Sequence, residues 1–444
     1  MIDTQTQSIL LELLNFSSRR NIKLFVVGGT LRDHFLQQKI TDIDLTGKDI
    51  AKIATAFAKS LNLTSIPLDK TLGRSTTRII LSRQKHLDCT DMQGSRIEED
   101  LSQRDFTMNA MGQELPDFLA SKNGVIDLFG GREDLDNKTI QAVSGSVFVA
   151  DPLRMLRAFR FAATLGFTIE SHTLKKIFDD KEMISKTAAE RIWQELLLLF
   201  GADNTGDSIN LMKETGLLSC LTSITFTEWE NVLTYYNRLE HIFLNPHLYF
   251  PKYAPKIISS KISLIKLSLL LINMDINLSI ENKKRKDFGT PKTFETLKTL
   301  KASNSEIAYI CRSIQNFQLF SRPLSSSPNE SSLYDLCVKA GDQLVAGILL
   351  QVCTLAFPEN PERIENEKLA PYEKLLDFYF MRYLPILEEK ALMNGNDIMK
   401  LFNIPPSPVL ANVLENIQRA QILGEIKTFE EAKSLAAKIL KSQE

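Results

Sequence analysis

The sequence has few cysteines and no excess of positive charge, and each shortage excludes a class of protein. The five cysteines among 444 residues are odd in number and widely spaced, and none forms a C-x-x-C pair. This argues against both a disulfide framework and a zinc site. Lysine and arginine together number 53 and aspartate and glutamate 54, so the net charge of −1 gives no general attraction to nucleic acid. Any contact with RNA must come from local basic patches.

Signals for export and for membrane insertion are also missing. The first residues lack the basic start and apolar core of a signal peptide, and the apolar run at 264–271 is too short to cross a bilayer. We therefore expect a cytoplasmic protein without a membrane partner. The length and the 43% hydrophobic content predict a globular chain with two or more modules.

The apolar pattern changes near residue 145. Before that point both helical and strand periodicity occur, and together they predict an α+β module. The expected elements are helices at 8–16 and 50–61 and strands at 22–27, 42–45, 78–81 and 86–90. Beyond Asp151 strand signals fade, and helical spacing dominates, as in Ile192, Leu196 and Phe200. The rest of the chain is therefore predicted to be mostly helical.

A glycine pair follows the predicted strand at 22–27. In Gly28-Gly29-Thr30-Leu31-Arg32-Asp33, paired glycines let the backbone approach a triphosphate, and a helix starting near Leu31 adds N–H donors. Arg32 can then bind phosphate oxygens. Nine residues after Asp33 comes Asp42-Ile43-Asp44, whose two carboxylates share one face of a strand and can hold Mg²⁺. Alone, either pattern is more often a plain turn or a solvated strand edge.

In this order, the patterns resemble the nucleotidyltransferase superfamily whose palm is shared with DNA polymerase β. The resemblance implies two-metal transfer of a nucleotide, with Asp42 and Asp44 as metal ligands. A third carboxylate is usual in that superfamily. Asp88 is our candidate and Asp91 the alternative, and a plain surface aspartate is about as frequent at such a spacing.

Further motifs narrow the family. They are 104–110 (RDFTMNA), 127–134 (DLFGGRED) and 151–161 (DPLRMLRAFRF), and together they resemble the class II tRNA nucleotidyltransferases, which comprise CCA-adding enzymes and bacterial poly(A) polymerases. The resemblance covers about residues 20–200. It implies a palm-like mixed-sheet head at 1–145, a helical neck at 146–202 that recognises the base, a helical body at 203–330 and a helical tail at 331–444 that binds tRNA.

The resemblance also assigns roles in nucleotide binding. Arg104, Asp105 and Asn109 stand in the ribose-selecting motif, although a helix start with a surface ion pair is the ordinary alternative. Asp151 and Arg154 occupy the positions that present a Watson–Crick-like edge to the incoming base. An amine-bearing base, cytosine or adenine, fits an acceptor beside a donor, so CTP and ATP are the expected nucleotides.

The same stretch adds a basic stripe and one departure from the family. Arg157 and Arg160 continue the spacing of Arg154 and would lie along the phosphates, although such stripes are more often solvated helix faces. Relatives usually carry Glu before the selecting Asp, whereas this chain has Ala150, which removes a support. The stretch 188–196 resembles the last helical motif, which we interpret as structural.

The prediction of which nucleotides are added rests on the short segment between Asp88 and Glu98. In CCA-adding relatives a flexible loop before the Arg-Asp motif helps to switch from cytosine to adenine, whereas here only 89–97 separate Asp88 from Glu98. We therefore favour CC addition to tRNA, with contacts at its 3′ end and elbow and a separate enzyme adding the final adenosine. Full CCA addition, A addition and poly(A) synthesis remain alternatives, with an inactive RNA-binding homologue as a remote one.

Overall fold

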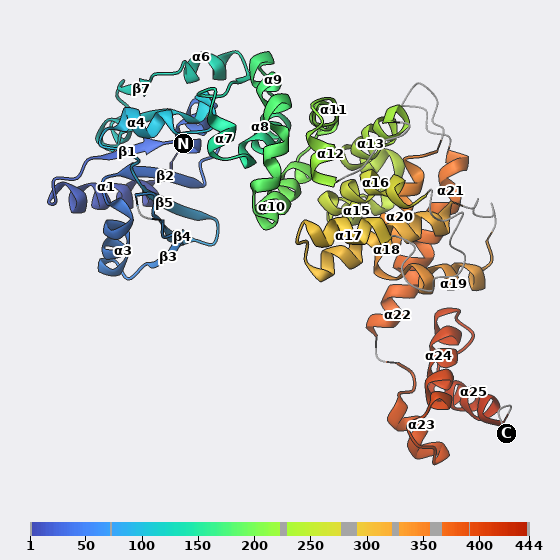
Figure 1. Ribbon diagram of the computed structural model, residues 1–444. Helices are drawn as coiled ribbons and strands as arrows, with labels where there is room; N and C mark the ends of the chain where they lie inside the picture. Colours follow the sequence, from blue (N-terminus) through green and yellow to red (C-terminus); the bar gives the residue numbers. More distant parts are fainter. Residues whose placement is uncertain are drawn as a thin grey trace. The chain divides into compact units, whose positions relative to one another are not determined.

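The computed structural model describes residues 2–71, 73–222, 229–276, 291–321, 328–355, 366–389 and 391–441. The chain divides into two compact units, residues 1–224 and residues 225–444 (Figure 1). The first unit combines a mixed sheet with helices, and the described part of the second unit is helical. The predicted fold class, an α+β head followed by helices, is confirmed. The finer boundaries at residues 145, 202 and 330 stay predictions.

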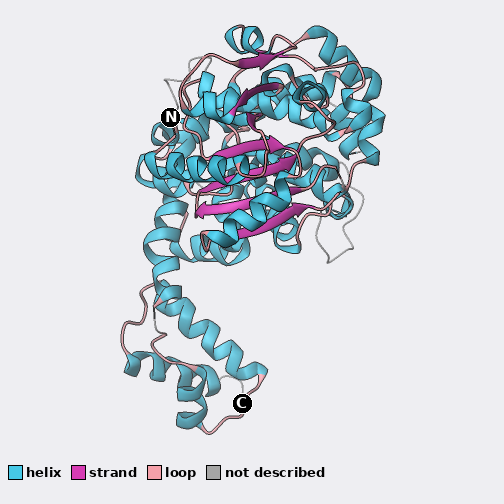
Figure 2. Cartoon of the chain, turned by 90° about the vertical axis from the view of Figure 1, so that its left-hand side faces the viewer, coloured by secondary structure: helices cyan, strands magenta, loops and turns pink. Residues whose placement is uncertain are grey.

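A mixed sheet forms the centre of the first unit (Figure 2). In the described residues it has seven strands in the order β3-β4-β5-β2-β1-β6-β7. All neighbours are antiparallel except β2 and β5, which are parallel. A separate parallel pair joins β8 and β9. The strands are β1 Leu24–Val27, β2 Asp42–Gly47, β3 Thr64–Asp69, β4 Thr76–Ser82, β5 Lys85–Asp91, β6 Met111–Glu114, β7 Val125–Asp127, β8 Thr139–Ile140 and β9 Thr168–Ile169.

Helices lie between these strands along the chain and continue after them. They are α1 Thr4–Ser18, α2 Gly29–Phe35, α3 Ile50–Ser60, α4 Ile97–Ser102, α5 Leu115–Leu119, α6 Gly131–Asp136, α7 Val147–Ala150, α8 Leu153–Leu165, α9 Ser171–Asp180, α10 Ala189–Gly201, α11 Gly206–Glu214 and α12 Leu217–Thr222, with 3₁₀ turns η1 Thr107–Asn109 and η2 Lys181–Lys186. α8 packs against α10. α8 is followed by its C-cap residue Gly166, whose φ of +67° suits a residue without a Cβ.

The pleat of β2 and β5 separates an apolar face from a polar one. Ile43, Leu87 and Cys89 are buried on the face that α3 covers. Asp91 lies on that same face and accepts a hydrogen bond from the backbone N–H of Ala51 at the start of α3 (2.9 Å). Because side chains alternate along a strand, the residues between them project to the opposite face, which α3 leaves open. The site described below lies there.

The second unit contains the remaining described helices. They are α13 Trp229–Leu244, α14 Pro246–Tyr249, α15 Ala254–Ile258, α16 Ile262–Ile276, α17 Pro291–Thr299, α18 Asn304–Phe320, α19 Glu330–Ala340, α20 Leu344–Val352, α21 Asn366–Phe378, α22 Leu384–Glu388, α23 Gly395–Phe402, α24 Pro408–Ile422 and α25 Phe429–Lys441, with 3₁₀ turns η3 Pro251–Tyr253 and η4 Gly341–Gln343 and a π-helical segment η5 Tyr379–Tyr383. Helices α23 to α25 share an apolar core that includes Ile398, Val413 and Ala436. Among the described residues no helix is long and apolar enough to span a membrane.

Candidate active site

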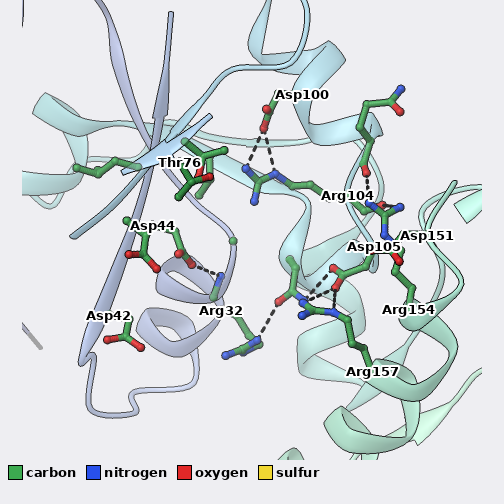
Figure 3. Close-up of a pocket in the computed structure, with 18 of the residues that line it drawn as sticks. Arg32, Asp42, Asp44, Thr76, Asp100, Arg104, Asp105, Asp151, Arg154 and Arg157 are labelled. Carbon is green, nitrogen blue, oxygen red and sulfur yellow. Dashed lines mark hydrogen bonds and ion pairs between the residues drawn. The ribbon is translucent and has the colours of Figure 1, made fainter. Parts of the chain in front are cut away.

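All the site residues predicted from the sequence line one cavity of about 640 Å³ in the first unit. The polar face of β2 and β5 forms one wall, and the segment from α4 to α8 forms another (Figure 3). The predicted residues found there are Gly28, Gly29, Arg32, Asp42, Asp44, Asp88, Arg104, Asp105, Asn109, Asp151, Arg154, Arg157 and Arg160. The fold therefore brings together groups that are up to 132 positions apart in the sequence (160 − 28). Their individual roles stay predictions.

Asp42 and Asp44 stand on the same face of β2, as their i, i+2 spacing predicts (Figure 3). Asp42 is half exposed and contacts the imidazole Nε2 of His86 at 3.0 Å. Asp44 is partly buried, and its Oδ2 accepts a hydrogen bond from the backbone N–H of Gly29 at 3.1 Å. Within the described residues neither carboxylate forms an ion pair with lysine or arginine. Two neighbouring carboxylates without a lysine or arginine partner suit a divalent metal ion.

The surroundings of Asp44 shift the pKa of its carboxyl. Burial raises the pKa of its carboxyl from 3.8 to about 6; the positive charge of Arg104 opposes this shift, and the negative charge of Asp88 adds to it. The backbone of Asp44 is held separately, since its N–H donates to Thr30 Oγ1 at 2.7 Å. The carboxylate is thus fixed in place in a setting that disfavours its negative charge.

Asp88 lies directly beside Asp44, because β2 and β5 pair in parallel with these two residues in register. Both of its carboxylate oxygens are bound by Arg78 of β4, from Nε to Oδ1 and from Nη2 to Oδ2, each at 2.7 Å. Asp91, the alternative third carboxylate, lies on the opposite face and caps α3. The geometry thus favours Asp88 over Asp91, with the difference that Asp88 already has a cationic partner.

The glycine pair allows a close approach of backbone and side chains. Gly28 has a φ of +65°, and a Cβ there would lie 3.0 Å from Arg104 Nη1 and 3.1 Å from Asp44 Oδ2. Any side chain at this position would fill the space between the carboxylate and the guanidinium. Helix α2 starts at Gly29, two residues earlier than predicted. Its first N–H donates to Asp44.

Four side chains form a continuous polar chain across the cavity (Figure 3). Arg32 Nη1 donates to Asn109 Oδ1 at 3.0 Å, and Asn109 Nδ2 donates to Asp105 Oδ1 at 3.1 Å. Asp105 Oδ2 then accepts from Arg157 Nε at 2.9 Å and lies 2.7 Å from Nη2 of the same guanidinium. Arg32 comes from α2, Asp105 from the connection between α4 and η1, Asn109 from η1 and Arg157 from α8, so these hydrogen bonds join separate parts of the fold.

Asp105 is buried but strongly paired. Burial alone would raise the pKa of its carboxyl, but the charge of Arg157 and hydrogen bonds from Arg157, Asn109 and the Phe106 N–H outweigh burial and lower it to about 2. Asp105 is therefore ionised at neutral pH, and the shift is opposite to that of Asp44.

The predicted base-selecting pair occupies the other end of the cavity. Asp151 follows α7, and its two oxygens accept from Nη1 and Nη2 of Arg191 at 3.3 and 2.8 Å. Arg154 donates from Nη2 to the Gln103 carbonyl at 2.6 Å and from Nη1 to the carbonyls of Arg104 and Val147 at 3.4 Å. These bonds use three of the five guanidinium N–H groups, which leaves donors for a ligand.

Comparison with known proteins places the chain in a family. Residues 24–141 match the family model described as the poly(A) polymerase head domain, residues 166–223 the one described as the probable RNA- and SrmB-binding site of polymerase A, and residues 289–436 the one for tRNA nucleotidyltransferase domain 2. The CC-adding tRNA nucleotidyltransferase of Geobacter sulfurreducens is 26% identical over 428 residues, which cover 93% of this chain and 91% of that protein. The chain belongs to the tRNA nucleotidyltransferase and poly(A) polymerase family.

Other members of this family carry a different product in their names. The CCA-adding enzyme of Lactobacillus johnsonii is 26% identical over 440 residues, covering 95% of this chain and 94% of that protein. Among solved structures, the Thermotoga maritima CCA-adding enzyme complexed with tRNA superimposes with a TM-score of 0.69 at 23% identity, covering 100% of this chain and 97% of that one. The predicted family is confirmed, whereas the choice between CC and CCA addition is not resolved by these relatives.

Three groups at the cavity were not predicted from the sequence. The carboxylate of Asp100 is buried and accepts a hydrogen bond from Arg104 Nη2 at 2.8 Å. Arg191 lies in the stretch that we interpreted as structural, yet it binds Asp151. Arg74, in the β3–β4 connection, lines the cavity, and its side chain forms no hydrogen bond or ion pair within the described residues. An arginine within a family motif was the available signal for Arg191.

Proposed function

We propose that this protein is a nucleotidyltransferase that adds nucleotides to the 3′ end of tRNA without a nucleic-acid template. The observation that carries the proposal is that Asp42 and Asp44 share one cavity with the Asp151 and Arg154 pair. The first pair suits phosphoryl chemistry, and the second pair can select a base. Membership of the tRNA nucleotidyltransferase and poly(A) polymerase family supports the same reaction class.

Asp42 and Asp44 are proposed to hold Mg²⁺. Their fit to a hard cation rests on oxygen donors that form no ion pair with lysine or arginine in the described residues and on the partly buried Asp44, whose raised pKa a neighbouring positive charge would reverse. When bound, divalent metal ions would lower the pKa of the attacking 3′-hydroxyl and neutralise charge on the triphosphate. The Gly29 N–H keeps the Asp44 carboxylate directed into the cavity.

Guanidinium groups near the carboxylates are proposed to bind phosphates. Arg104 is fixed through Nε and Nη2 by Asp100, so its Nη1 stays available beside Gly28. Arg74 has no side-chain partner in the described residues, which suits it to an anionic ligand such as the RNA backbone. The absence of a side chain at Gly28 keeps the space between these groups open.

Asp151 and Arg154 are proposed to choose the base. An ionised carboxylate only accepts hydrogen bonds, and a guanidinium only donates them. Cytosine and adenine each present an amine beside a ring acceptor and match this pair, whereas uracil presents a carbonyl where the amine would be. CTP and ATP are therefore the proposed nucleotides. The neck residues, 146–202, would carry this selection, and the tail would bind tRNA.

The short connection between β5 and α4 supports CC addition. Residues 92–96 are tied to α4, since Asp100 Oδ1 accepts from the Gln93 N–H at 3.0 Å and Glu99 Oε2 from the Ser95 N–H at 2.7 Å. Gly94 lies so close that a Cβ there would be 2.2 Å from Glu99 Oε2. A segment of five residues bound in this way offers no long loop to reshape the base site. The partner adding the final adenosine would be a separate enzyme, and a cytoplasmic location stays part of the proposal.

The test uses purified protein, Mg²⁺ and tRNA lacking its 3′ end. CTP alone, ATP alone or both are supplied, and the ends are sequenced. We expect two cytidines with CTP alone and the same ends when ATP is added. A terminal adenosine after CC would contradict CC addition and support CCA addition, whereas long adenosine tails on unrelated RNA would identify a poly(A) polymerase.

A further inference from the structure

The carboxylate of Asp151 is held from two sides. Arg191, near the start of α10, binds both of its oxygens, with Nη2 to Oδ2 at 2.8 Å and Nη1 to Oδ1 at 3.3 Å. The backbone N–H of Leu153 donates to Oδ1 at 3.3 Å. The Asp151 side chain is 15% exposed and that of Arg191 is 51% exposed, so Arg191 reaches from the surface to a group at the cavity wall.

The local backbone does not fix this carboxylate by itself. Asp151 terminates the single turn of α7 in an extended conformation (φ −148°, ψ 100°). The preceding residue, Ala150, is exposed and has no polar side-chain atom, so it provides no side-chain hydrogen bond to this carboxylate. The orientation of the carboxylate therefore depends on Arg191 and on one long backbone hydrogen bond.

Helix α10 makes a second contact of the same kind one turn further along. Glu195, four residues after Arg191, is buried and its Oε1 accepts from Arg160 Nε at 2.5 Å. Residues i and i+4 share one face of a helix, so a single face of α10 binds two side chains that line the cavity. This face packs toward α8, which carries Arg154 and Arg160.

We propose that Arg191 is a positioning residue that fixes the Asp151 carboxylate and thereby determines how well the enzyme rejects uracil and guanine. The proposal rests on the base-selecting role of Asp151 and Arg154 given above. Each carboxylate oxygen has two lone pairs, and Arg191 occupies one on each. The Leu153 N–H takes the second position on Oδ1, which leaves Oδ2 to accept from the amine of cytosine or adenine.

A flexible carboxylate would select less well. Without Arg191, Asp151 could rotate away from the base and admit water between them, so a uracil carbonyl would no longer meet a fixed acceptor. The enzyme would lose discrimination between nucleotides rather than phosphoryl transfer, because Asp42 and Asp44 lie on another wall of the cavity.

The test measures kcat and KM for CTP and for UTP with tRNA lacking its 3′ end. The variants are Arg191→Ala, Arg191→Gln and Arg191→Lys, with Arg20→Ala as a control. Arg20 is an exposed arginine just beyond α1 whose guanidinium donates to the Phe16 carbonyl and lies over the Phe16 ring, and it is not among the residues that line the cavity. In Arg191→Ala and Arg191→Gln we expect the ratio of kcat/KM for CTP to that for UTP to fall about tenfold, mainly through a higher KM for CTP.

The Lys variant separates positioning from charge. Lysine keeps the positive charge but cannot bind both oxygens through a planar fork, so Arg191→Lys should recover only part of the ratio. An unchanged ratio in Arg191→Ala and Arg191→Gln, or an equal loss for CTP and UTP, would overturn the proposal. Failure of the unmodified protein to incorporate CTP into tRNA would overturn the proposed function itself, which is a different result.

Discussion

The carboxylates at the two ends of the cavity differ in their ion pairing, and their pKa values shift in opposite directions. At the metal end, defined by Asp42 and Asp44, neither carboxylate forms an ion pair with arginine or lysine in the described residues, and burial raises the pKa of Asp44 to about 6. At the base end, defined by Asp105 and Asp151, each carboxylate is bound by a guanidinium, and the pKa of Asp105 is lowered to about 2. Figure 3 shows the two ends on opposite sides of the view.

The difference follows from what each end is proposed to do. A carboxylate that already binds arginine has a partner that a metal ion would have to displace, whereas one without a cation gains by binding a metal. A base-selecting group needs a fixed direction before the nucleotide arrives, and paired arginines supply it. Aspartate therefore has no lysine or arginine partner at the metal end in the described residues, whereas it is paired with arginine at the base end.

Removal of the metal ligands should have the largest effect. Asp42→Ala or Asp44→Ala should reduce nucleotide incorporation at least about a thousandfold, because each removes part of the charge that holds the metal ions, while tRNA binding stays measurable. Asp136→Ala, at an acidic side chain 74% exposed on α6, is the matched control and should retain activity. If both cavity variants kept their activity, the metal assignment would be refuted.

Substitutions at the base end should instead lower the free energy of unfolding of the protein. Asp105→Asn leaves the Arg157 guanidinium without its charged partner and should lower the free energy of unfolding by about 3 kcal/mol, measured by urea denaturation. Replacing both partners, as in Asp105→Asn with Arg157→Gln, should cost less than the sum of the single changes. Additive effects would show that the pair contributes no coupling.

The two ends should also differ in the sign of their pH dependence. The folded pKa of Asp105 is depressed, so its contribution is present above pH 4 and is lost as the pH falls toward 2. The folded pKa of Asp44 is raised, so metal-free protein loses stability as the pH rises from 3.8 through about 6.

Denaturation in the presence of a chelator checks this contrast. Asp44→Asn should match the unmodified protein near pH 4 and exceed its stability by about 2 kcal/mol at pH 7. Added Mg²⁺ should remove the advantage by stabilising only the protein that retains the carboxylate. A constant difference across this pH range would contradict the raised pKa of Asp44.

Asp88 combines features of the two ends, and its substitution should have the smallest effect on incorporation. It lies beside Asp44 but is paired with Arg78, as the acids of the base end are paired with their arginines. We expect Asp88→Asn to reduce incorporation about tenfold and to leave the Mg²⁺ dependence nearly unchanged, because the contact with the metal would be indirect. A loss as large as that of Asp44→Ala, with weaker Mg²⁺ binding, would instead identify Asp88 as a third metal ligand.

Local patterns predicted much of the metal end. The strand, the glycine pair and the Asp-x-Asp spacing all lie within residues 24–45, where alternation and turn chemistry are enough to place the side chains. The predicted helices and strands of this region occur within a few residues of their expected bounds, because their burial patterns are regular. The resemblance then supplied Asp151 and Arg154.

Contacts between segments far apart in the chain could not be predicted from the sequence. Strands β6 and β7 were not predicted, since they are short and acquire their conformation through pairing of β6 with β1 and of β7 with β6. Asp105 and Arg157 are 52 positions apart and Asp151 and Arg191 are 40 apart, so residue spacing gives no indication that they meet. For that reason Arg191 was interpreted as part of a structural helix.

The most direct test of the division between the two ends compares Asp42→Asn with Asp151→Asn in the incorporation of CTP and UTP. An asparagine at position 151 offers an amide that both donates and accepts, so it can meet the uracil carbonyl. The account predicts that Asp42→Asn lowers the rates for both nucleotides by the same factor, whereas Asp151→Asn lowers the CTP to UTP preference and retains transfer. An unchanged preference in Asp151→Asn, or a changed one in Asp42→Asn, would contradict it.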